Sequence, residues 1–455
     1  MPAAVRQAAW EELAAIVGAE HVRAGTAGDV VDGVGAAGGG AVGGGGAPDG
    51  VEPPRIAEPG TPEELARCLR WARDAGLKVT PRGGGTKMGW GNPPAACDLL
   101  LSTARLDRVL EHAWADMTVI AEAGCRVADL QQALGVHGQH LALDPLWPRQ
   151  ATVGGILATN DSGTLRLRHG SLRDLIIGIT VALPDGTLAK SGGKVVKNVA
   201  GYDLAKLFTG ALGTLGVIVQ AIFRLHPLPR QTRSLTFSGT PEALNPLLLA
   251  ILAARLTPLG LQLRAASGGA RLDVRFDGTA AGIEAQVDQL RRLAAGVPGA
   301  SLFAEAAAEA GDMWTAHQAL WDRAADAPAA SALVAKLSVL PTHVAAVCAQ
   351  IERAAAARSL TWDMVMQGVG AGYVRFDGEE PALRAALLEL REALAGGGAQ
   401  QGGGGSLVAL GCPPAVKRGL DVWGAASDAQ PVMVRIKQRF DPDGTLSPGR
   451  FLGGI

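Results

Sequence analysis

Two glycine-rich loops contain the residues of this chain that are best suited to bind a charged ligand. In the first, residues 81–87, three consecutive glycines separate Arg82 from Lys87. In the second, residues 151–163, short hydroxyl and amide side chains flank the pair Gly154-Gly155. Glycine allows close approach of a backbone to a ligand, and successive N–H groups can form a concave anion site. We interpret the loops as holding one diphosphate; the alternatives are a solvated hairpin and a tight buried turn.

A diphosphate held by two separate loops indicates a dinucleotide, but not one bound in a Rossmann site. Residues 33–38 formally match G-x-G-x-x-G, yet no strand pattern precedes them and no amphipathic helix follows. They belong to residues 28–50, which are almost all Gly, Ala, Val and Asp. Such a segment buries too little apolar surface to offset its ordering entropy. We therefore interpret it as a flexible linker and the match as accidental. A second glycine tract, residues 396–405, is interpreted in the same way.

Local signals predict the elements that position the first loop. Thr61 and Glu64 form a capping box around Pro62, and apolar residues then follow at helical spacing. Gly76 ends this helix in a left-handed conformation, and residues 77–80 form a short strand that leads into the loop. A helix, a strand and the loop therefore make one compact unit.

Strand patterns follow, and then the pattern changes. Apolar residues alternate at 175–183 and 217–225, and prolines at 227 and 229 mark a domain edge. Beyond about residue 230, Ala- and Leu-rich helices alternate with short strands such as 272–276 and 372–376, which is typical of an antiparallel sheet flanked by helices. We predict an α+β chain with a helix at 1–27, the linker at 28–50, a binding domain at 51–229, a cap domain at 230–430 and a C-terminal segment at 431–455.

Composition excludes several classes of function. The net charge of −1 and the aromatic content of 4% argue against nucleic acid or an anionic membrane as the main partner. The five cysteines are dispersed, without a Cys-x-x-Cys pair, which argues against a local iron–sulfur or zinc site and fits a reducing compartment. Charged residues interrupt the apolar N-terminus, and no apolar run is long enough to span a bilayer. We expect a soluble, cytoplasmic chain.

Two further groups of residues are candidates for chemistry. Tyr202, one of two tyrosines, lies near the end of the unusual run 192–203. It either faces a cofactor or substrate or is an ordinary core tyrosine. His137 and His140 have H-x-x-H spacing, but no third ligand with suitable spacing is near. We therefore expect no metal site there.

A set of motifs, taken in order along the chain, resembles the vanillyl-alcohol-oxidase (PCMH-type) FAD-binding domain. The run 191–207 resembles one branch in particular, the FAD-binding E subunits of bacterial glycolate oxidase (glycolate dehydrogenase). The motifs are Arg82-Gly83-Gly84-Gly85-Thr86-Lys87, Thr152-Val153-Gly154-Gly155, Ala158-Thr159-Asn160-Asp161-Ser162-Gly163, Gly170-Ser171-Leu172-Arg173-Asp174 and Gly213-Thr214-Leu215-Gly216-Val217-Ile218.

The resemblance implies two α+β subdomains that hold FAD between them, followed by a cap domain. It implies that a set of motif residues contacts the cofactor, and that Tyr202 and Arg450 are candidates near the flavin. The implied cofactor contacts are Arg82, Gly83, Gly84, Gly85, Thr86, Lys87, Thr152, Val153, Gly154, Gly155, Ala158, Thr159, Asp161, Ser162, Gly163, Arg173, Asp174 and Ile218.

The resemblance also implies a function. The chain is expected to be an FAD subunit that oxidises glycolate to glyoxylate and passes electrons to an iron–sulfur subunit, beside a sister FAD subunit. Any association with the inner face of a membrane would be indirect, through this complex. Two alternatives remain: a self-sufficient FAD oxidase of another 2-hydroxy acid or alcohol, and a non-catalytic assembly subunit with structural FAD.

Three departures from the family pattern qualify these expectations. Thr86 stands where covalent members place a histidine, so we expect dissociable FAD. Ser447 replaces the asparagine of the usual Asn-Pro-Gly-Arg tail, and the His/His/Glu metal cluster of catalytic paralogues is not evident between residues 230 and 430. The missing cluster favours a supporting role over substrate oxidation by this chain itself.

Overall fold

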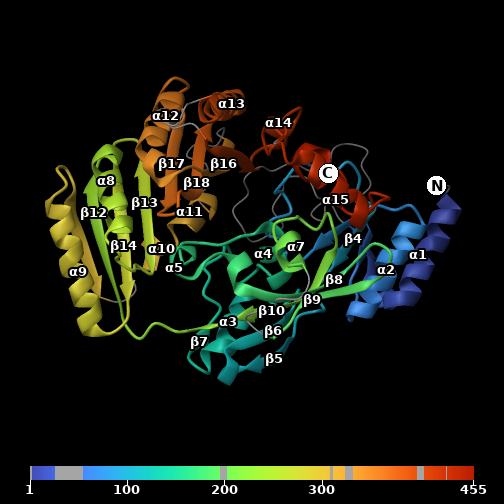
Figure 1. The fold of residues 1–455 in the computed structure, drawn as a ribbon. Coiled ribbons are helices and arrows are strands. Elements are labelled where there is room, and N and C mark those ends of the chain that lie inside the picture. The colour runs from blue at the N-terminus through green and yellow to red at the C-terminus, as the bar shows by residue number, and fades with distance from the viewer. Residues whose placement is uncertain are drawn as a thin grey trace.

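The computed structural model describes residues 3–25, 55–194, 202–307, 311–322, 331–396, 404–426 and 428–455 (Figure 1). The linker expected at 28–50, most of the tract at 396–405 and most of the run before Tyr202 lie outside these residues. Two sheets of the N-terminal half lie together, and a larger sheet forms a separate body beside them (Figure 1).

The first subdomain is a four-stranded sheet that positions the first glycine loop. Its strand order is β1-β2-β4-β3, and β2 and β3 run parallel to β4. One half of the predicted capping box is present, since the Thr61 side chain accepts from the Glu64 N–H, whereas the Glu64 carboxylate accepts from the N–H of Gly60 and not from that of Thr61. The loop follows directly from the end of β3. The elements are α1 (Ala3–Val17), β1 (Val22–Ala24), β2 (Arg55–Ala57), α2 (Pro62–Asp74), β3 (Val79–Arg82) and β4 (Leu99–Ser102).

The second subdomain is a five-stranded antiparallel sheet in the order β5-β6-β10-β8-β9. Helix α4 carries the Gly154-Gly155 pair and packs its apolar side chains against β6 and β10. The elements are β5 (Val109–Ala113), β6 (Thr118–Glu122), α3 (Val127–Gly135), β7 (Gln139–His140), α4 (Val153–Thr159), α5 (Arg166–His169), α6 (Leu172–Leu175), β8 (Ile176–Ala182), β9 (Leu188–Gly192), α7 (Leu204–Phe208), β10 (Val217–Arg224) and β11 (His226–Pro227).

The cap is an eight-stranded, fully antiparallel sheet in the order β15-β12-β14-β13-β17-β18-β16-β19. Helices α8, α9, α12 and α13 cover one face and bury the largest apolar core (Figure 1). The predicted α+β class and the antiparallel cap with flanking helices are confirmed. The elements are β12 (Thr232–Gly239), α8 (Pro241–Ala253), β13 (Gly260–Ala266), β14 (Gly269–Asp277), α9 (Ala280–Ala295), β15 (Ser301–Ala307), α10 (Gly311–Trp314), α11 (Ala316–Asp322), β16 (Ser331–Ser338), α12 (Val344–Ala356), β17 (Thr361–Gln367), β18 (Ala371–Gly378), α13 (Glu380–Gly396) and β19 (Ser406–Gly411).

The C-terminal segment leaves the cap and packs on the first two subdomains. After α14 (Pro414–Lys417) comes α15 (Gln430–Phe440), whose Lys437 ammonium lies 2.8 Å from the Thr214 carbonyl and 2.5 Å from Asp441. Leu446 forms an isolated parallel bridge with Val79 of β3. The tail therefore braces the strand that leads into the first loop. Among the described helices, none has the length and apolarity that crossing a bilayer requires.

Three histidines meet where the chain passes from the second subdomain to the cap. His140 of β7 pairs in register with His226 of β11, and the His169 ring lies 4.4 Å from that of His226. The Nε2 atoms of His140 and His226 are buried without a hydrogen-bond partner. Burial is the main cause that lowers the pKa of His140 and of His169 from 6.5 to about 4, and neighbouring cationic groups add to the shift. The cluster therefore stays neutral in the folded protein well below pH 6.5.

This lowered pKa predicts a loss of stability in mild acid. The unfolded chain protonates these imidazoles near pH 6.5, whereas the folded chain does so only near pH 4. The free energy of unfolding is therefore expected to fall as pH drops between these values. Urea unfolding followed across this range measures the slope. Joint replacement His140→Gln and His169→Gln should flatten the slope, whereas the same change at the exposed His137 should leave it intact. An unaltered slope in the double variant would contradict the assignment.

Candidate functional site

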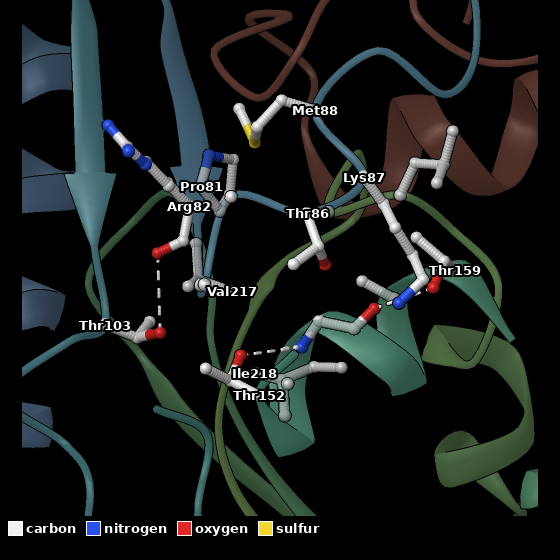
Figure 2. A pocket seen from close by; sticks show the side chains of 18 of the residues that line it. Pro81, Arg82, Thr86, Lys87, Met88, Thr103, Thr152, Thr159, Val217 and Ile218 are labelled. Atoms are coloured by element: carbon white, nitrogen blue, oxygen red, sulfur yellow. Dashed lines mark hydrogen bonds between the residues drawn. The ribbon is translucent and has the colours of Figure 1, made fainter. Parts of the chain in front are cut away.

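A cavity lies between the two glycine loops (Figure 2). The end of β3, helix α4, the segment around residues 208–218 and the C-terminal tail contribute to its walls. The lining residues are Pro81, Arg82, Gly83, Gly84, Gly85, Thr86, Lys87, Met88, Thr103, Thr152, Gly154, Gly155, Ala158, Thr159, Phe208, Leu212, Gly213, Gly216, Val217, Ile218 and Arg450.

The first glycine loop presents a row of free backbone donors. Within the described residues, the N–H groups of residues 83–87 donate no hydrogen bond to the protein. Polar groups of this kind are seldom left unsatisfied in folded proteins. Five consecutive N–H groups on the wall of a cavity match the oxygen-rich diphosphate of a dinucleotide.

The second loop contributes shape more than donors. The N–H of Val153 donates to Cys125 and that of Gly154 donates to Ala123, so the first turn of α4 is already bound to the end of β6. The Thr152 hydroxyl accepts from the Gly155 N–H at 3.3 Å (Figure 2). A Cβ on Gly154 would lie 2.8 Å from that of Ala123, whereas one on Gly155 would meet only Thr152 Oγ1 within 4 Å. Gly154 therefore permits packing, and Gly155 leaves room in the cavity.

The two loops are in direct contact. A Cβ added to Gly84 would lie 1.8 Å from the Gln150 carbonyl oxygen, and one added to Gly83 would lie 2.2 Å from Thr152 Oγ1. Both distances are far shorter than any real contact, so another residue would have to displace the Gln150 backbone at position 84 and the Thr152 side chain at position 83. The glycines in the first loop are therefore needed for the loops to meet around one ligand.

A buried ion pair connects the cavity to the cap. Lys87 lines the cavity, and its Nζ atom lies 2.9 Å from Asp161 Oδ2, with both side chains buried. The contact lacks hydrogen-bonding geometry, and the ammonium lies 5.7 Å and 5.6 Å from the ring centres of Trp90 and Trp147. Asp161 also accepts from the Leu146 N–H, and its charge, after burial, raises the pKa of Tyr373 in the cap sheet. Lys87 thus pairs with Asp161 while it lines the cavity, and its predicted contact with a phosphate stays a prediction.

Arg450 holds the first loop from behind. It is buried, lines the cavity and donates to the carbonyl oxygens of Lys87, Met88 and Trp90. Burial lowers the pKa of its guanidinium to about 10, so the side chain remains charged at neutral pH. Arg450 is therefore a positioning residue that fixes carbonyls at the end of the loop.

Most of the predicted cofactor residues line the cavity. In Figure 2 the Arg82 and Lys87 side chains extend in different directions, and Lys87 reaches towards α4. The predicted residues on the wall are Arg82, Gly83, Gly84, Gly85, Thr86, Lys87, Thr152, Gly154, Gly155, Ala158, Thr159 and Ile218.

Six predicted cofactor residues do not line the cavity, and each has another place. Val153 is a core residue, and Ser162 accepts from the Leu172 N–H. Gly163 packs so closely that a Cβ would lie 2.2 Å from the Asp144 carbonyl oxygen. Asp161 pairs with Lys87. Arg173 and Asp174 lie in α6, where Asp174 closes a capping box with Ser171. These six motif residues therefore shape the fold around the cavity and do not form its wall.

The structure also corrects the candidate Tyr202. Its side chain is 91% exposed and is absent from the cavity wall, so it neither faces the cavity nor belongs to the core. His137 is exposed and stacks on Trp114, while His140 belongs to the buried histidine cluster. Among the described residues, no group of three or more His, Cys, Asp or Glu side chains is arranged to hold a metal ion.

Several lining residues had no clear signal in the sequence. Most are apolar, and they reach the cavity through tertiary packing of segments distant in the chain. The motif Gly213–Ile218 resembles the family pattern, but among its residues only Ile218 is expected to contact the cofactor. The remaining lining residues are Pro81, Met88, Thr103, Phe208, Leu212, Gly213, Gly216 and Val217.

Comparisons with known proteins agree with this site. Residues 53–192 match the family described as FAD binding domain, and residues 250–392 match the C-terminal domain of the FAD linked oxidases. The first match contains both glycine loops, and the second lies in the cap. The chain therefore combines an FAD-binding domain with a C-terminal domain of the FAD linked oxidases. Its cofactor is FAD.

The names of several relatives state a 2-hydroxy acid as the substrate. Glycolate oxidase subunit GlcD of Bacillus subtilis is 31% identical over 211 residues, which cover 46% of this chain and 45% of that protein. D-2-hydroxyglutarate dehydrogenase of Bos taurus is 36% identical over 41% of this chain and 34% of that protein. D-lactate dehydrogenase [cytochrome] of Arabidopsis thaliana is 27% identical over 88% of this chain and 73% of that protein. The chain matches less than half the length of the first two relatives.

Solved structures share the fold of this chain. p-Cresol methylhydroxylase aligns with a TM-score of 0.73 over 99% of this chain and 97% of that one, at 13% identity. 4-Ethylphenol oxidase from Gulosibacter chungangensis aligns with a TM-score of 0.70 and the same coverage, at 16% identity. The two-subdomain binding domain and the cap are therefore a shared architecture.

The free donors of residues 83–87 and the space at Gly155 fit the diphosphate of FAD, which predicts the effect of one substitution. Gly155→Val should abolish FAD binding while the protein still folds, because the new side chain meets open cavity and not the core. Flavin absorbance after gel filtration measures binding, and circular dichroism measures folding. The control is Gly135→Val, at a position where a Cβ meets nothing within 4 Å. Retained flavin in the Gly155 variant would contradict the site.

Removal of the Arg450 contacts should weaken FAD binding without eliminating it. Arg450→Gln loses the charged donors to three carbonyls of the loop, and hydrogen bonds to charged groups contribute about 1.5–3 kcal/mol each. We expect the dissociation constant for FAD to rise about tenfold, equivalent to roughly 1.4 kcal/mol. Fluorescence titration of the apoprotein measures it, with Arg418→Gln on the exposed end of α14 as control. An unchanged affinity would show that the loop is held without Arg450.

Proposed function

We propose that this chain uses dissociable FAD to oxidise a 2-hydroxy acid to the 2-oxo acid, with glycolate and glyoxylate as the first pair to test. The relatives named for glycolate, D-lactate and D-2-hydroxyglutarate support this class of substrate. The proposal rests on a link between the FAD cavity and the cap. Lys87 on the cavity wall pairs with Asp161, and Asp161 in turn raises the pKa of Tyr373 in the cap sheet. The link supports the proposal because it brings a polar group of the cap close to the wall of the FAD cavity.

FAD supplies the hydride acceptor when bound, and the protein supplies position and environment. The N–H groups of residues 83–87 hold the diphosphate, and Arg450 keeps that loop in place. The rings of Trp90, Trp147 and Trp321 pack together beside Lys87 and exclude water from the same region. Burial and the Asp161 carboxylate raise the pKa of Tyr373 well above its ordinary value, so its hydroxyl stays protonated.

We propose further that electrons leave through partner subunits. The motifs shared with the E subunits of bacterial glycolate oxidase support a complex with an iron–sulfur subunit and a sister FAD subunit in the cytoplasm. Thr86, on the cavity wall at the position where covalent members have a histidine, supports FAD that is bound without a covalent bond.

The visible spectrum of the purified chain, before and after anaerobic addition of glycolate, tests this function. Bleaching of the flavin is the expected result. A flavin spectrum that glycolate leaves unchanged in the chain, but that D-lactate bleaches, would shift the substrate within the class. No bleaching by any 2-hydroxy acid, alone or with the partner subunits, would assign the oxidation elsewhere. Oxygen consumption by the isolated chain would instead indicate a self-sufficient oxidase.

A further inference from the structure

The chain crosses from the FAD domain to the cap beside a small ribbon that belongs to none of the larger sheets. Strands β7 and β11 form this ribbon, a two-stranded antiparallel sheet of their own. Just beyond the ribbon, the N–H of Leu228 donates to the Gly138 carbonyl. The cap sheet begins shortly afterwards, at Thr232 of β12 (Figure 1). The ribbon therefore fastens the segment that leads into the cap.

Three histidine rings pack together on this ribbon. His140 and His226 oppose each other in register, which places their side chains on one face. The His169 ring of α5 lies 4.4 Å from that of His226 and 6.2 Å from that of His140. The Nε2 atoms of His140 and His226 are buried without a hydrogen-bond partner. A proton on any ring therefore places a charge against two other imidazoles, where no side chain of the cluster can accept from it.

Cations outnumber carboxylates among the groups that face the cluster. Arg224 of β10 faces His169 and His226, and its own Nε atom is buried without a partner. Asp277, at the end of β14, faces His140 from the cap, but its carboxylate raises the pKa of His140 less than burial and His226 lower it. The other facing groups are Arg168 of α5 and, on the wall of the cavity beside His140, Arg230, Arg275 and Arg233, the last paired with Glu284 and Glu305.

We propose that His140, His169 and His226 form an acid-sensitive latch between the FAD domain and the cap. With neutral rings the ribbon stays closed and the cap keeps its place on the FAD domain. With protonated rings the ribbon opens, the Leu228 contact breaks and the cap is free to move, while both sheets of the FAD domain stay folded. The latch is independent of the proposed oxidation, and it assigns the acid response to the domain boundary before any unfolding of the whole chain.

The direction of the response follows from which form binds more protons. In the closed ribbon the pKa values of His140 and His169 lie at about 4, and burial followed by Arg224 lowers that of His226. Imidazoles in an open ribbon titrate near the ordinary value of 6.5. The open form therefore binds more protons, and the closed form loses stability as pH falls from 6.5 towards 4. Uptake of two protons changes the ratio of open to closed chains by up to about a hundredfold per pH unit.

Hydrogen–deuterium exchange of the FAD-loaded chain, corrected for the intrinsic effect of pH on exchange, measures the opening. We expect the amides of the ribbon and of Leu228 to lose protection between pH 6.5 and 4, while those of β6, β8 and β10 keep theirs. The radius of gyration from small-angle X-ray scattering should rise over the same range. Far-UV circular dichroism should stay constant, FAD should remain bound, and a return to neutral pH should reverse the change.

Variants identify the groups that form the latch. Joint replacement His140→Gln and His169→Gln should remove most of the response, whereas His137→Gln, at an exposed position, is the matched control and should leave it intact. Asp277→Asn removes the carboxylate that faces His140, so the ribbon should open at higher pH. A disulfide between Gln139→Cys and Pro227→Cys, which oppose each other in the ribbon, should prevent opening when oxidised and permit it when reduced.

The outcomes separate a latch from general acid unfolding. Protection that is lost at the ribbon alone, and that persists in the double histidine variant and in the oxidised disulfide variant, supports the latch. Simultaneous loss of protection in the ribbon and in the sheets of the FAD domain, with release of FAD, overturns it. A ribbon that stays protected down to pH 4, or that opens equally in the double variant, also overturns it. None of these results bears on substrate oxidation, which the flavin spectrum at neutral pH tests separately.

Discussion

The contact between the two glycine loops is the constraint on which the rest of the site depends. Gly84 lies against the Gln150 carbonyl and Gly83 against the Thr152 hydroxyl, with no space for a side chain between them. The loops belong to different sheets, so this contact also sets the position of one subdomain against the other. Arg450 and Lys437 of the tail hold neighbouring carbonyls of both subdomains. The N–H groups of residues 83–87 remain without protein partners because contacts from several sides hold the surrounding backbone in place.

The buried pair of Lys87 and Asp161 extends this constraint to the cap. Desolvation of two charges is costly, and a buried ion pair by itself is weak evidence for stability. Here the pair has a location that explains it: Lys87 belongs to the first loop, Asp161 to the second, and Tyr373, whose pKa Asp161 raises, comes from the cap sheet. Three segments distant in the sequence therefore meet at one charge, and the position of the cap depends on the same loops that receive FAD.

Sequence reasoning reached the fold and the loops because both leave local signals. Alternating apolar residues marked the strands, the Thr61 capping box marked α2, and glycine triplets and pairs marked the loops. It failed where the role of a residue is decided by its neighbours in space. Lys87 has the same local context whether it meets a phosphate or Asp161, and Tyr202 has the same context whether it is buried or 91% exposed.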